Sequence, residues 1–271
     1  MPSVFLAVKK ERKIVDEIIE KEHILGVISD NRFGVRSKKV PSVYITHQLQ
    51  VLSGNTTYFT SKVHQKIWEK FDECWIPDTA STPNLSGKLG HLQSSKFKLK
   101  YIGILSRLNY FKTTLKYDLL VLLSGPEPQR SILESKVLTA LKNYQGKVLF
   151  VRGALKNAAA LQTAENIEVN NYLLSLDLEK AINESKLVLA RSGYSTIMDL
   201  AVLGKKAFFI PTPGQFEQEY LAEKLSKESI APFSTQDKFK IEDLKKANNF
   251  KGLQAIKSEL NLNLFELFKG K

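Results

Sequence analysis

Cysteine is almost missing from this sequence, since Cys74 is the only one in 271 residues. A single thiol cannot form an intramolecular disulfide, so a reducing cytoplasm suits the chain best. Cys74 lies in an apolar run with Trp75 and Ile76. This context predicts a packed core side chain and argues against a nucleophile.

Long apolar runs are also missing, because none approaches the roughly 18 residues of a membrane-spanning helix. Near the N-terminus, Glu11, Asp16 and Glu17 interrupt the basic residues and no continuous apolar stretch follows, so we expect no signal peptide there. The sequence has no P-loop, no His-Glu-x-x-His motif and no cysteine cluster. These absences disfavour NTPases and zinc enzymes.

Acidic residues are the scarcer charged class, at 28 against 40 lysines and arginines, which gives a net charge of +12 and a pI near 9.5. Such a balance predicts an anionic partner: nucleic acid, an anionic membrane surface or a phosphorylated substrate. The lysines are scattered, with one modest cluster at Lys96, Lys98 and Lys100, and no nucleic-acid-binding signature is present. We therefore expect no nucleic acid partner.

Short apolar runs alternate with amphipathic stretches along most of the chain, which predicts an α/β fold with parallel sheets covered on both faces. A polar connection near residues 106–116 suggests two blocks, over residues 1–110 and 111–250, followed by a helical tail at 251–271 that crosses back over the first block. The predicted strands are Gly26–Ser29, Pro41–Thr46, Cys74–Pro77, Tyr101–Ile104, Leu119–Leu123, Val148–Val151, Ile167–Val169, Leu187–Ala190 and Ala207–Ile210.

Three loops at predicted strand ends carry the candidate chemistry. The first, Ser124–Arg130, turns from a strand into a helix, where unpaired backbone N–H groups and the positive helix end could face an anion. The alternative is an ordinary turn whose shape Pro126 and Pro128 set. Ligands bind at this edge of open α/β sheets, so three such loops together indicate a binding site.

The second loop, Arg191–Asp199, is the most informative. Gly193 allows a close turn, and Ser195 or Thr196 is predicted to cap the helix that follows. Asp199 then lies about one turn inside that helix, facing the loop, where its carboxylate could accept hydrogen bonds from the vicinal hydroxyls of a ribose. The alternative is that Asp199 only complements the helix dipole.

The third loop, Pro211–Gln215, is rich in proline and glycine and leads into a helix that begins with polar residues. If its strand neighbours the strand Leu187–Ala190, then Gln218 and Glu219 lie beside Asp199. A solvated helix start is the alternative on spacing alone.

The run Leu187–Leu225, with its Arg-Ser-Gly, Thr, Asp and Pro-Gln segments, resembles the C-terminal domain of family 28 glycosyltransferases of the MurG type. The resemblance covers Lys116–Pro232 well and Gly26–Arg107 more weakly. It implies the GT-B fold, in which two Rossmann-like domains face a cleft. The C-terminal domain then binds a UDP-sugar donor, and the N-terminal domain binds the acceptor.

The resemblance carries over to individual positions of this sequence. Asp199 takes the place of the acidic residue that holds the ribose, although it is an aspartate where the family has a glutamate. Gln218 matches a glutamine that contacts the donor sugar, with Glu219 beside it, and Arg107 matches a basic residue that neutralises the leaving diphosphate without a metal. The remaining matches to the nucleotide and phosphate loops are Ser124, Gly125, Gln129, Arg191, Ser192, Gly193, Ser195 and Thr196.

Two departures from the family pattern stand out. Pro126 and Pro128 replace residues of a Gly-Gly-Ser-Gln-Gly type loop and cannot donate backbone N–H bonds. The family's opening strand and Gly-x-Gly-Gly-His type turn have no counterpart, so we expect the first βαβ portion of the N-terminal domain, with its candidate catalytic histidine, to be missing.

The remaining candidates for a general base are Asp30 and His47, because both follow predicted strands. The reaction needs a group that takes the proton from an acceptor hydroxyl, and histidine suits this role near neutral pH. Gln48 follows His47 where the family tends to have a glutamate. Loop or core hydrogen bonding is the alternative for both residues.

The sequence thus predicts an inverting, metal-independent hexosyltransferase that uses a UDP-sugar and a saccharide or lipid-linked acceptor of the bacterial cell envelope. It needs no cofactor beyond this donor substrate. Its positive charge predicts peripheral contact with anionic lipid at the inner face of the plasma membrane. Two alternatives stay open: a nucleotide-sugar-binding module that is inactive alone because it is truncated or split, and a UDP-sugar hydrolase or epimerase.

Overall fold

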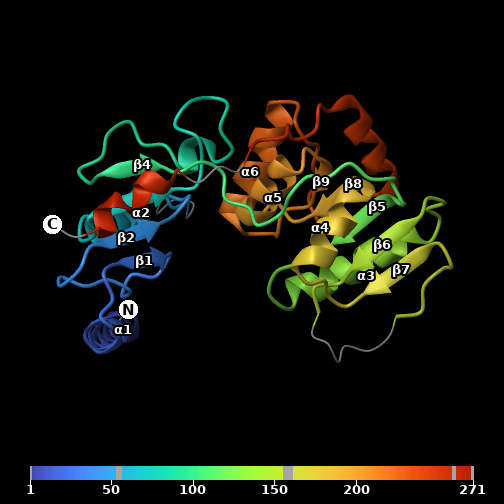
Figure 1. Ribbon diagram of the computed structural model, residues 1–271. Helices are drawn as coiled ribbons and strands as arrows, with labels where there is room; N and C mark the ends of the chain where they lie inside the picture. The colour runs from blue at the N-terminus through green and yellow to red at the C-terminus, as the bar shows by residue number, and fades with distance from the viewer. Residues whose placement is uncertain (1, 53–56, 155–160, 258–260, 270–271) are drawn as a thin grey trace. The chain divides into compact units, whose positions relative to one another are not determined.

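The computed structural model describes the whole chain except residues 1, 53–56, 155–160, 258–260 and 270–271 (Figure 1). It contains two compact units, and each is built on its own parallel sheet. Unit 1 comprises residues 1–105 and 259–271, and unit 2 comprises residues 106–258. The predicted α/β class with parallel sheets is confirmed.

Unit 1 has a four-stranded sheet in the order β1-β2-β3-β4, with strands parallel throughout. Its core combines Tyr44, Leu49, Trp68 and Phe71 with the thiol of Cys74, whose pKa burial raises to about 12. The core position predicted for Cys74 is confirmed. The elements are α1 (Pro2–Glu22), β1 (Val27–Asp30), β2 (Ser42–Ile45), α2 (Thr57–Trp68), β3 (Glu73–Ile76), the 3-10 helix η1 (Gly87–Leu89) and β4 (Leu99–Tyr101).

The last strand of unit 1 begins two residues earlier than the apolar pattern predicted. Lys98 and Lys100 form ion pairs of 2.6 and 2.8 Å with Glu73, which is buried at the start of β3. These ion pairs stabilise polar residues at the start of β4. A prediction based on apolar runs therefore misses the start of this strand.

The chain's C-terminal tail differs from the single helix predicted from residue 251. Residues 251–257 are not helical, and Leu253 and Ile256 donate backbone hydrogen bonds to Lys205 and Ala201 of unit 2. The following 3-10 helix η3 (Leu262–Phe268) packs in unit 1, where Leu264 joins a core with Val43, Trp75 and Ile102. The tail's apolar residues, although spaced as in a helix, thus belong first to unit 2 and then to unit 1.

Unit 2 has a five-stranded parallel sheet in the order β7-β6-β5-β8-β9. All five strands match predicted strands to within two residues at each end, and the apolar runs of β5, β6, β8 and β9 are largely buried. The elements are β5 (Tyr117–Leu122), α3 (Gln129–Leu141), β6 (Val148–Val151), β7 (Ile167–Asn170), α4 (Ser175–Asn183), β8 (Ser185–Ala190), α5 (Tyr194–Val202), β9 (Lys206–Phe209), α6 (Phe216–Lys227) and the 3-10 helix η2 (Ile241–Asn249).

The strand order of unit 2 reverses direction between β5 and β8. The chain passes from β5 outward to β6 and β7, then returns to the other side of β5 for β8 and β9. Loops that leave the two strands at such a switch point diverge and open a crevice at the carboxyl edge, where α/β proteins bind their ligands. No described helix is both long and apolar enough to cross a membrane.

Candidate functional site

The three loops selected from the sequence lie at one edge of the unit 2 sheet. Leu122 of β5 pairs with Ala190 of β8, and Ala190 pairs with Phe209 of β9, all in parallel register. The loops at 123–128, 191–193 and 210–215 therefore leave neighbouring strands at the same carboxyl edge. The first two flank the switch point, so the topology brings together the segments that the sequence marked as binding loops.

The loop after β8 opens directly into α5 with Gly193 as its N-cap, and no side chain caps the helix. The predicted capping by Ser195 or Thr196 is wrong, because both already lie inside the first turn. The first helical bond runs from Ile197 N–H to Gly193 O, 3.0 Å. By helix geometry the first-turn amides before it, including those of Ser195 and Thr196, have no intrahelical acceptor and can bind an anion.

A glycine in each loop borders open space. A Cβ placed on Gly125, Gly193 or Gly214 would meet no atom within 4 Å. Gly125 and Gly214 have φ of +108° and +79°, so their backbone favours glycine. Gly193 has φ −70°, which any residue adopts. Neither the backbone conformation nor packing within the protein requires a glycine at position 193. A glycine there is expected if a ligand approaches the turn closely.

Asp199 is half-buried on α5, and Ser106 donates a 2.6 Å hydrogen bond to its Oδ1. Burial raises the pKa of this carboxyl above its ordinary value, although the Ser106 bond and the charge of Arg107 act in the opposite direction. Ser106 and Arg107 begin unit 2. The segment that begins unit 2 therefore contacts the carboxylate of Asp199, while the roles predicted for Arg107 and Asp199 stay predictions.

The loops after β8 and β9 are tied together by Ser192 and Gln218. The Ser192 hydroxyl donates to the carbonyl of Gln218, 2.8 Å, and the side-chain carbonyl of Gln218 accepts from Thr212 N–H, 2.9 Å. Glu219 accepts from Gly214 N–H through Oε1, 3.0 Å. Gln218 and Glu219 thus brace the β9 loop, and their contact with a donor sugar stays a prediction.

Arg191 lies beneath these loops with only 1% of its surface exposed. Its guanidinium donates to the carbonyls of Gln129, Ile210 and Pro211 and to the side chain of Gln236. Burial lowers its pKa to about 10. The structure therefore places Arg191 under the site, with its donors on protein oxygens.

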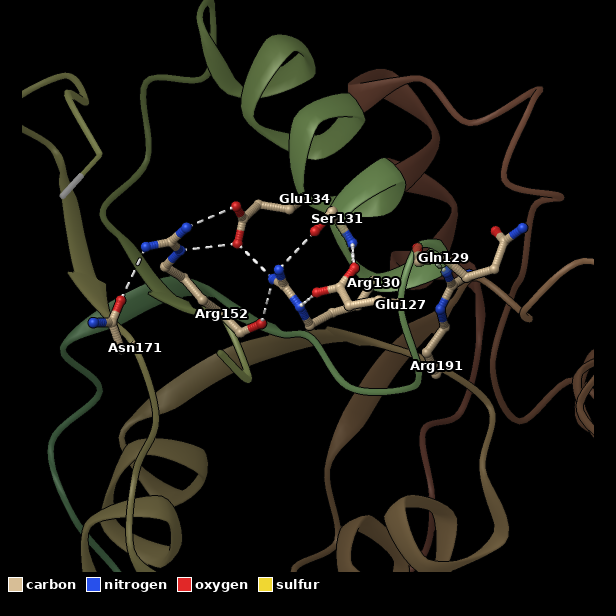
Figure 2. Close-up of polar contacts among 8 residues, drawn as sticks. All are labelled: Glu127, Gln129, Arg130, Ser131, Glu134, Arg152, Asn171 and Arg191. Carbon is tan, nitrogen blue, oxygen red and sulfur yellow. Dashed lines mark hydrogen bonds and ion pairs between the residues drawn. The ribbon is translucent and has the colours of Figure 1, made fainter. Parts of the chain in front are cut away.

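The loop after β5 carries the exposed Ser124 and Gly125 and ends at Gln129, whose side-chain carbonyl accepts from Gln236, 3.2 Å. A polar network that the sequence analysis missed fixes this end of the loop. Figure 2 shows Arg130 and Arg152 both pointing to Glu134, with Glu127 on Arg130 and Asn171 on Arg152. Charged residues four apart, at 130 and 134 of an otherwise mixed helix, were the only available signal.

The two candidate bases belong to unit 1, whereas the other candidates belong to unit 2. Asp30 is the last residue of β1 and is exposed, and His47 follows β2 and is half-buried. Because β1 and β2 are neighbouring parallel strands, both residues lie at the carboxyl edge of the unit 1 sheet.

Comparison with known proteins agrees with this architecture. Residues 129–251 match the family model of the glycosyltransferase family 28 C-terminal domain. Over 222 residues the chain is 24% identical to the UDP-N-acetylglucosamine--N-acetylmuramyl-(pentapeptide) pyrophosphoryl-undecaprenol N-acetylglucosamine transferase of Haemophilus ducreyi, covering 78% of this chain and 58% of that protein. An uncharacterized glycosyltransferase of Methanosarcina mazei is 28% identical over 222 residues, covering 74% and 57%. The chain thus spans somewhat less than three fifths of these two relatives.

Solved structures show the same fold. MurG of Acinetobacter baumannii superposes with a TM-score of 0.51 at 15% identity, covering 88% of this chain and 68% of that one. The glycotransferase of kitacinnamycin superposes with a TM-score of 0.59 at 12% identity, covering 91% and 73%. These likenesses show a fold of the GT-B type, and residues 129–251 match the C-terminal domain of glycosyltransferase family 28.

Proposed function

We propose that this chain is a hexosyltransferase that binds a UDP-sugar on unit 2 and transfers its hexose or N-acetylhexosamine to a saccharide or lipid-linked acceptor. The observation that carries the proposal is the convergence at the β5–β8 switch point of an uncapped helix end, an open glycine turn and a half-buried carboxylate. The helix end suits a diphosphate, the glycine turn allows the diphosphate to approach closely, and the carboxylate suits a ribose.

The diphosphate is proposed to lie over Gly193 at the N-terminus of α5. The free amides of the first turn and the positive end of the helix favour negative charge there. Arg107 is exposed on the segment that also reaches Asp199, so its cation is available to the same ligand. Ser124 and Gly125 border the site from the β5 loop.

The ribose is proposed to bind Asp199. Oδ1 of this carboxylate accepts from Ser106, and an ionised carboxylate has further acceptor capacity for the two vicinal hydroxyls. The aspartate is one methylene shorter than the family's glutamate.

The chemistry is a single displacement at the anomeric carbon. The acceptor oxygen forms the new glycosidic bond from the face opposite the leaving group, while the bond from the anomeric carbon to the β-phosphate oxygen breaks and inverts the centre. His47 or Asp30 takes the acceptor proton, and Arg107 with the α5 amides stabilises the charge on UDP. Transfer is proposed to be metal-independent, so EDTA should leave it unchanged.

The acceptor side is proposed from the relatives and from surface character. The relative from Haemophilus ducreyi is named as an N-acetylglucosamine transferase acting on N-acetylmuramyl-(pentapeptide) pyrophosphoryl-undecaprenol, which supports a lipid-linked acceptor. Helix α1 exposes Leu6, Ile14 and Ile18 beside its lysines, as a helix resting on anionic lipid would. Binding to vesicles that contain anionic phospholipid, and not to neutral vesicles, would support peripheral contact at the inner face of a plasma membrane.

Isothermal titration with UDP tests the donor site. We expect wild-type protein to bind UDP, and Asp199→Ala to lose at least tenfold in affinity, about 1.4 kcal/mol. Absence of UDP binding, or equal binding by the variant, would reject the site. Release of free sugar from a UDP-sugar without acceptor would indicate a hydrolase instead.

A further inference from the structure

Arg191 joins three chain segments that are distant in sequence. Nη1 donates to the carbonyls of Ile210 and Pro211, at 3.1 and 3.0 Å, in the loop after β9. Nη2 donates to the carbonyl of Gln129, 3.0 Å, at the end of the β5 loop, and to Oε1 of Gln236, 2.6 Å. Since Arg191 itself lies in the β8 loop, one planar guanidinium connects all three loops of the proposed donor site.

No carboxylate among the described residues accepts from this guanidinium, and burial alone accounts for its lowered pKa. The contrast within unit 2 is direct. Figure 2 shows Arg130 and Arg152 sharing Glu134, whereas Arg191 lies beside Gln129, to whose carbonyl it donates. A buried cation without a counter-ion is unfavourable, and proteins rarely keep one unless it serves a ligand.

The same loops hold two buried polar atoms without a hydrogen-bond partner among the described residues: Nε of Arg191 and Oγ1 of Thr212. Gly193, two residues after Arg191, is the N-cap residue of α5, and no side chain caps this helix end. The loop after β8 therefore contributes both a buried cation and the positive end of a helix. An anion bound at these loops would interact favourably with both.

We propose that Arg191 is a positioning residue of the donor site, which fastens the loops after β5, β8 and β9 to one another and whose uncompensated charge attracts the diphosphate they bind. The inference rests on the proposed function. It assigns Arg191 the role of holding the loops that bind the donor, and no contact of its own with the sugar. A lysine cannot replace it, because one ammonium does not reproduce the planar fork that reaches four acceptors.

Gln236→Glu tests the charge. The new carboxylate keeps an acceptor for Arg191 while supplying the missing counter-ion, and Gln236→Leu is the matched variant without charge. By titration calorimetry we expect Gln236→Glu to bind UDP about tenfold more weakly and uridine unchanged. In Gln236→Leu, the ratio of UDP to uridine affinity should equal that of wild type. Equal UDP binding by Gln236→Glu, or an equal loss for uridine, would overturn the electrostatic role.

Hydrogen exchange tests the fastening without any nucleotide. Arg191→Lys should increase amide exchange at 124–129, 210–215 and 233–236, and leave the segments around Arg152 and Asn171 as in wild type. Arg152→Lys is the matched change of another buried arginine. It should increase amide exchange around positions 152 and 171 and leave the three loops as in wild type. Uniform exchange changes in Arg191→Lys would overturn the fastening role. If wild type binds no UDP, the proposed function fails while the exchange result still decides this inference.

Discussion

The hydroxyl of Ser106 donates a 2.6 Å hydrogen bond to Oδ1 of Asp199, 93 residues further along the chain. Ser106 is the first residue of unit 2, and its oxygen also accepts from Leu108 N–H, 3.0 Å. The proposed ribose carboxylate is thus oriented by the segment that connects the two units. This relationship makes ribose recognition sensitive to a residue outside the binding loops.

Ser106→Ala should weaken ribose recognition without abolishing UDP binding. Loss of one hydrogen bond to a carboxylate is worth about 1–2 kcal/mol, so we expect a roughly fivefold to thirtyfold loss in UDP affinity. The preference for UDP over 2′-deoxy-UDP should decrease, because Asp199 is less firmly oriented. Calorimetry with both nucleotides measures it. An unchanged preference would show that Ser106 does not orient the ribose ligand.

Asp199→Asn should separate stability from binding. Burial raises the pKa of Asp199 above its ordinary 3.8, so ionisation of this group is unfavourable to folding above the raised pKa, and this effect disappears as the pH falls toward 3.8. Asparagine has no charge to bury and can still accept from Ser106. We expect a higher melting temperature than wild type at pH 7, a difference that vanishes in acid, and weaker UDP binding. A variant less stable at pH 7 would contradict this account.

Gly193→Ala should block the donor and spare the fold. The backbone there accepts alanine, and the added Cβ meets only open space within the protein. We expect UDP affinity to fall more than tenfold while the melting temperature changes little. Gly153→Ala is the contrast, because its Cβ would lie 2.3 Å from Leu123 O at φ +63°, and it should destabilise the protein. Undiminished UDP binding by Gly193→Ala would place the diphosphate elsewhere.

His47→Asn and Asp30→Asn should divide catalysis from donor binding. Both residues lie at the carboxyl edge of the unit 1 sheet, so neither change should alter UDP affinity on unit 2. The variant that removes the base should lower the rate of sugar transfer at least a hundredfold. Transfer from UDP-N-acetylglucosamine to lipid-linked and soluble saccharides measures this. Full activity in both variants would exclude both candidates.

The sequence predicted the strands of unit 2 well, because Val148–Val151 and its neighbours are apolar on both faces and short. It also predicted that the three candidate loops follow strand ends, and the structure shows that these strands, β5, β8 and β9, are neighbours. These are local signals, set by burial pattern and by turn residues. The prediction for β4 was displaced because Lys100 inside the strand and Lys98 just before it are polar and pair with Glu73, a contact that no local pattern contains.

The internal organisation of the site was less accessible to sequence. The family resemblance made Arg191 a candidate ligand contact, whereas in the structure its guanidinium donates to the carbonyls of residues 129, 210 and 211 and to the side chain of Gln236. The tail was read as one helix because its apolar residues recur at helical spacing, although they pack on two units in turn. The acceptors of a side chain such as Arg191, and the surface on which an apolar residue packs, depend on the tertiary structure and not on the local sequence.

The last prediction concerns the network that holds the β5 loop, where Glu134 lies between Arg130 and Arg152 (Figure 2). Burial alone would raise the pKa of Glu134, but hydrogen bonds from Arg152 and Arg130 outweigh it and the pKa lies below its ordinary value. A lowered carboxyl pKa contributes stability above pH 4.5, and that contribution is lost as the pH falls through the lowered value.

Glu134→Gln should therefore lower the free energy of unfolding at pH 7 by about 3–5 kcal/mol, because it leaves two buried arginines without their shared carboxylate. Urea titrations at pH 7 and near pH 3 measure the difference, which should shrink in acid as wild type loses the same charge. Glu223→Gln breaks an exposed pair with Lys227 and should change stability negligibly. An equal, small effect of both substitutions would mean that the network is not what fixes the loop.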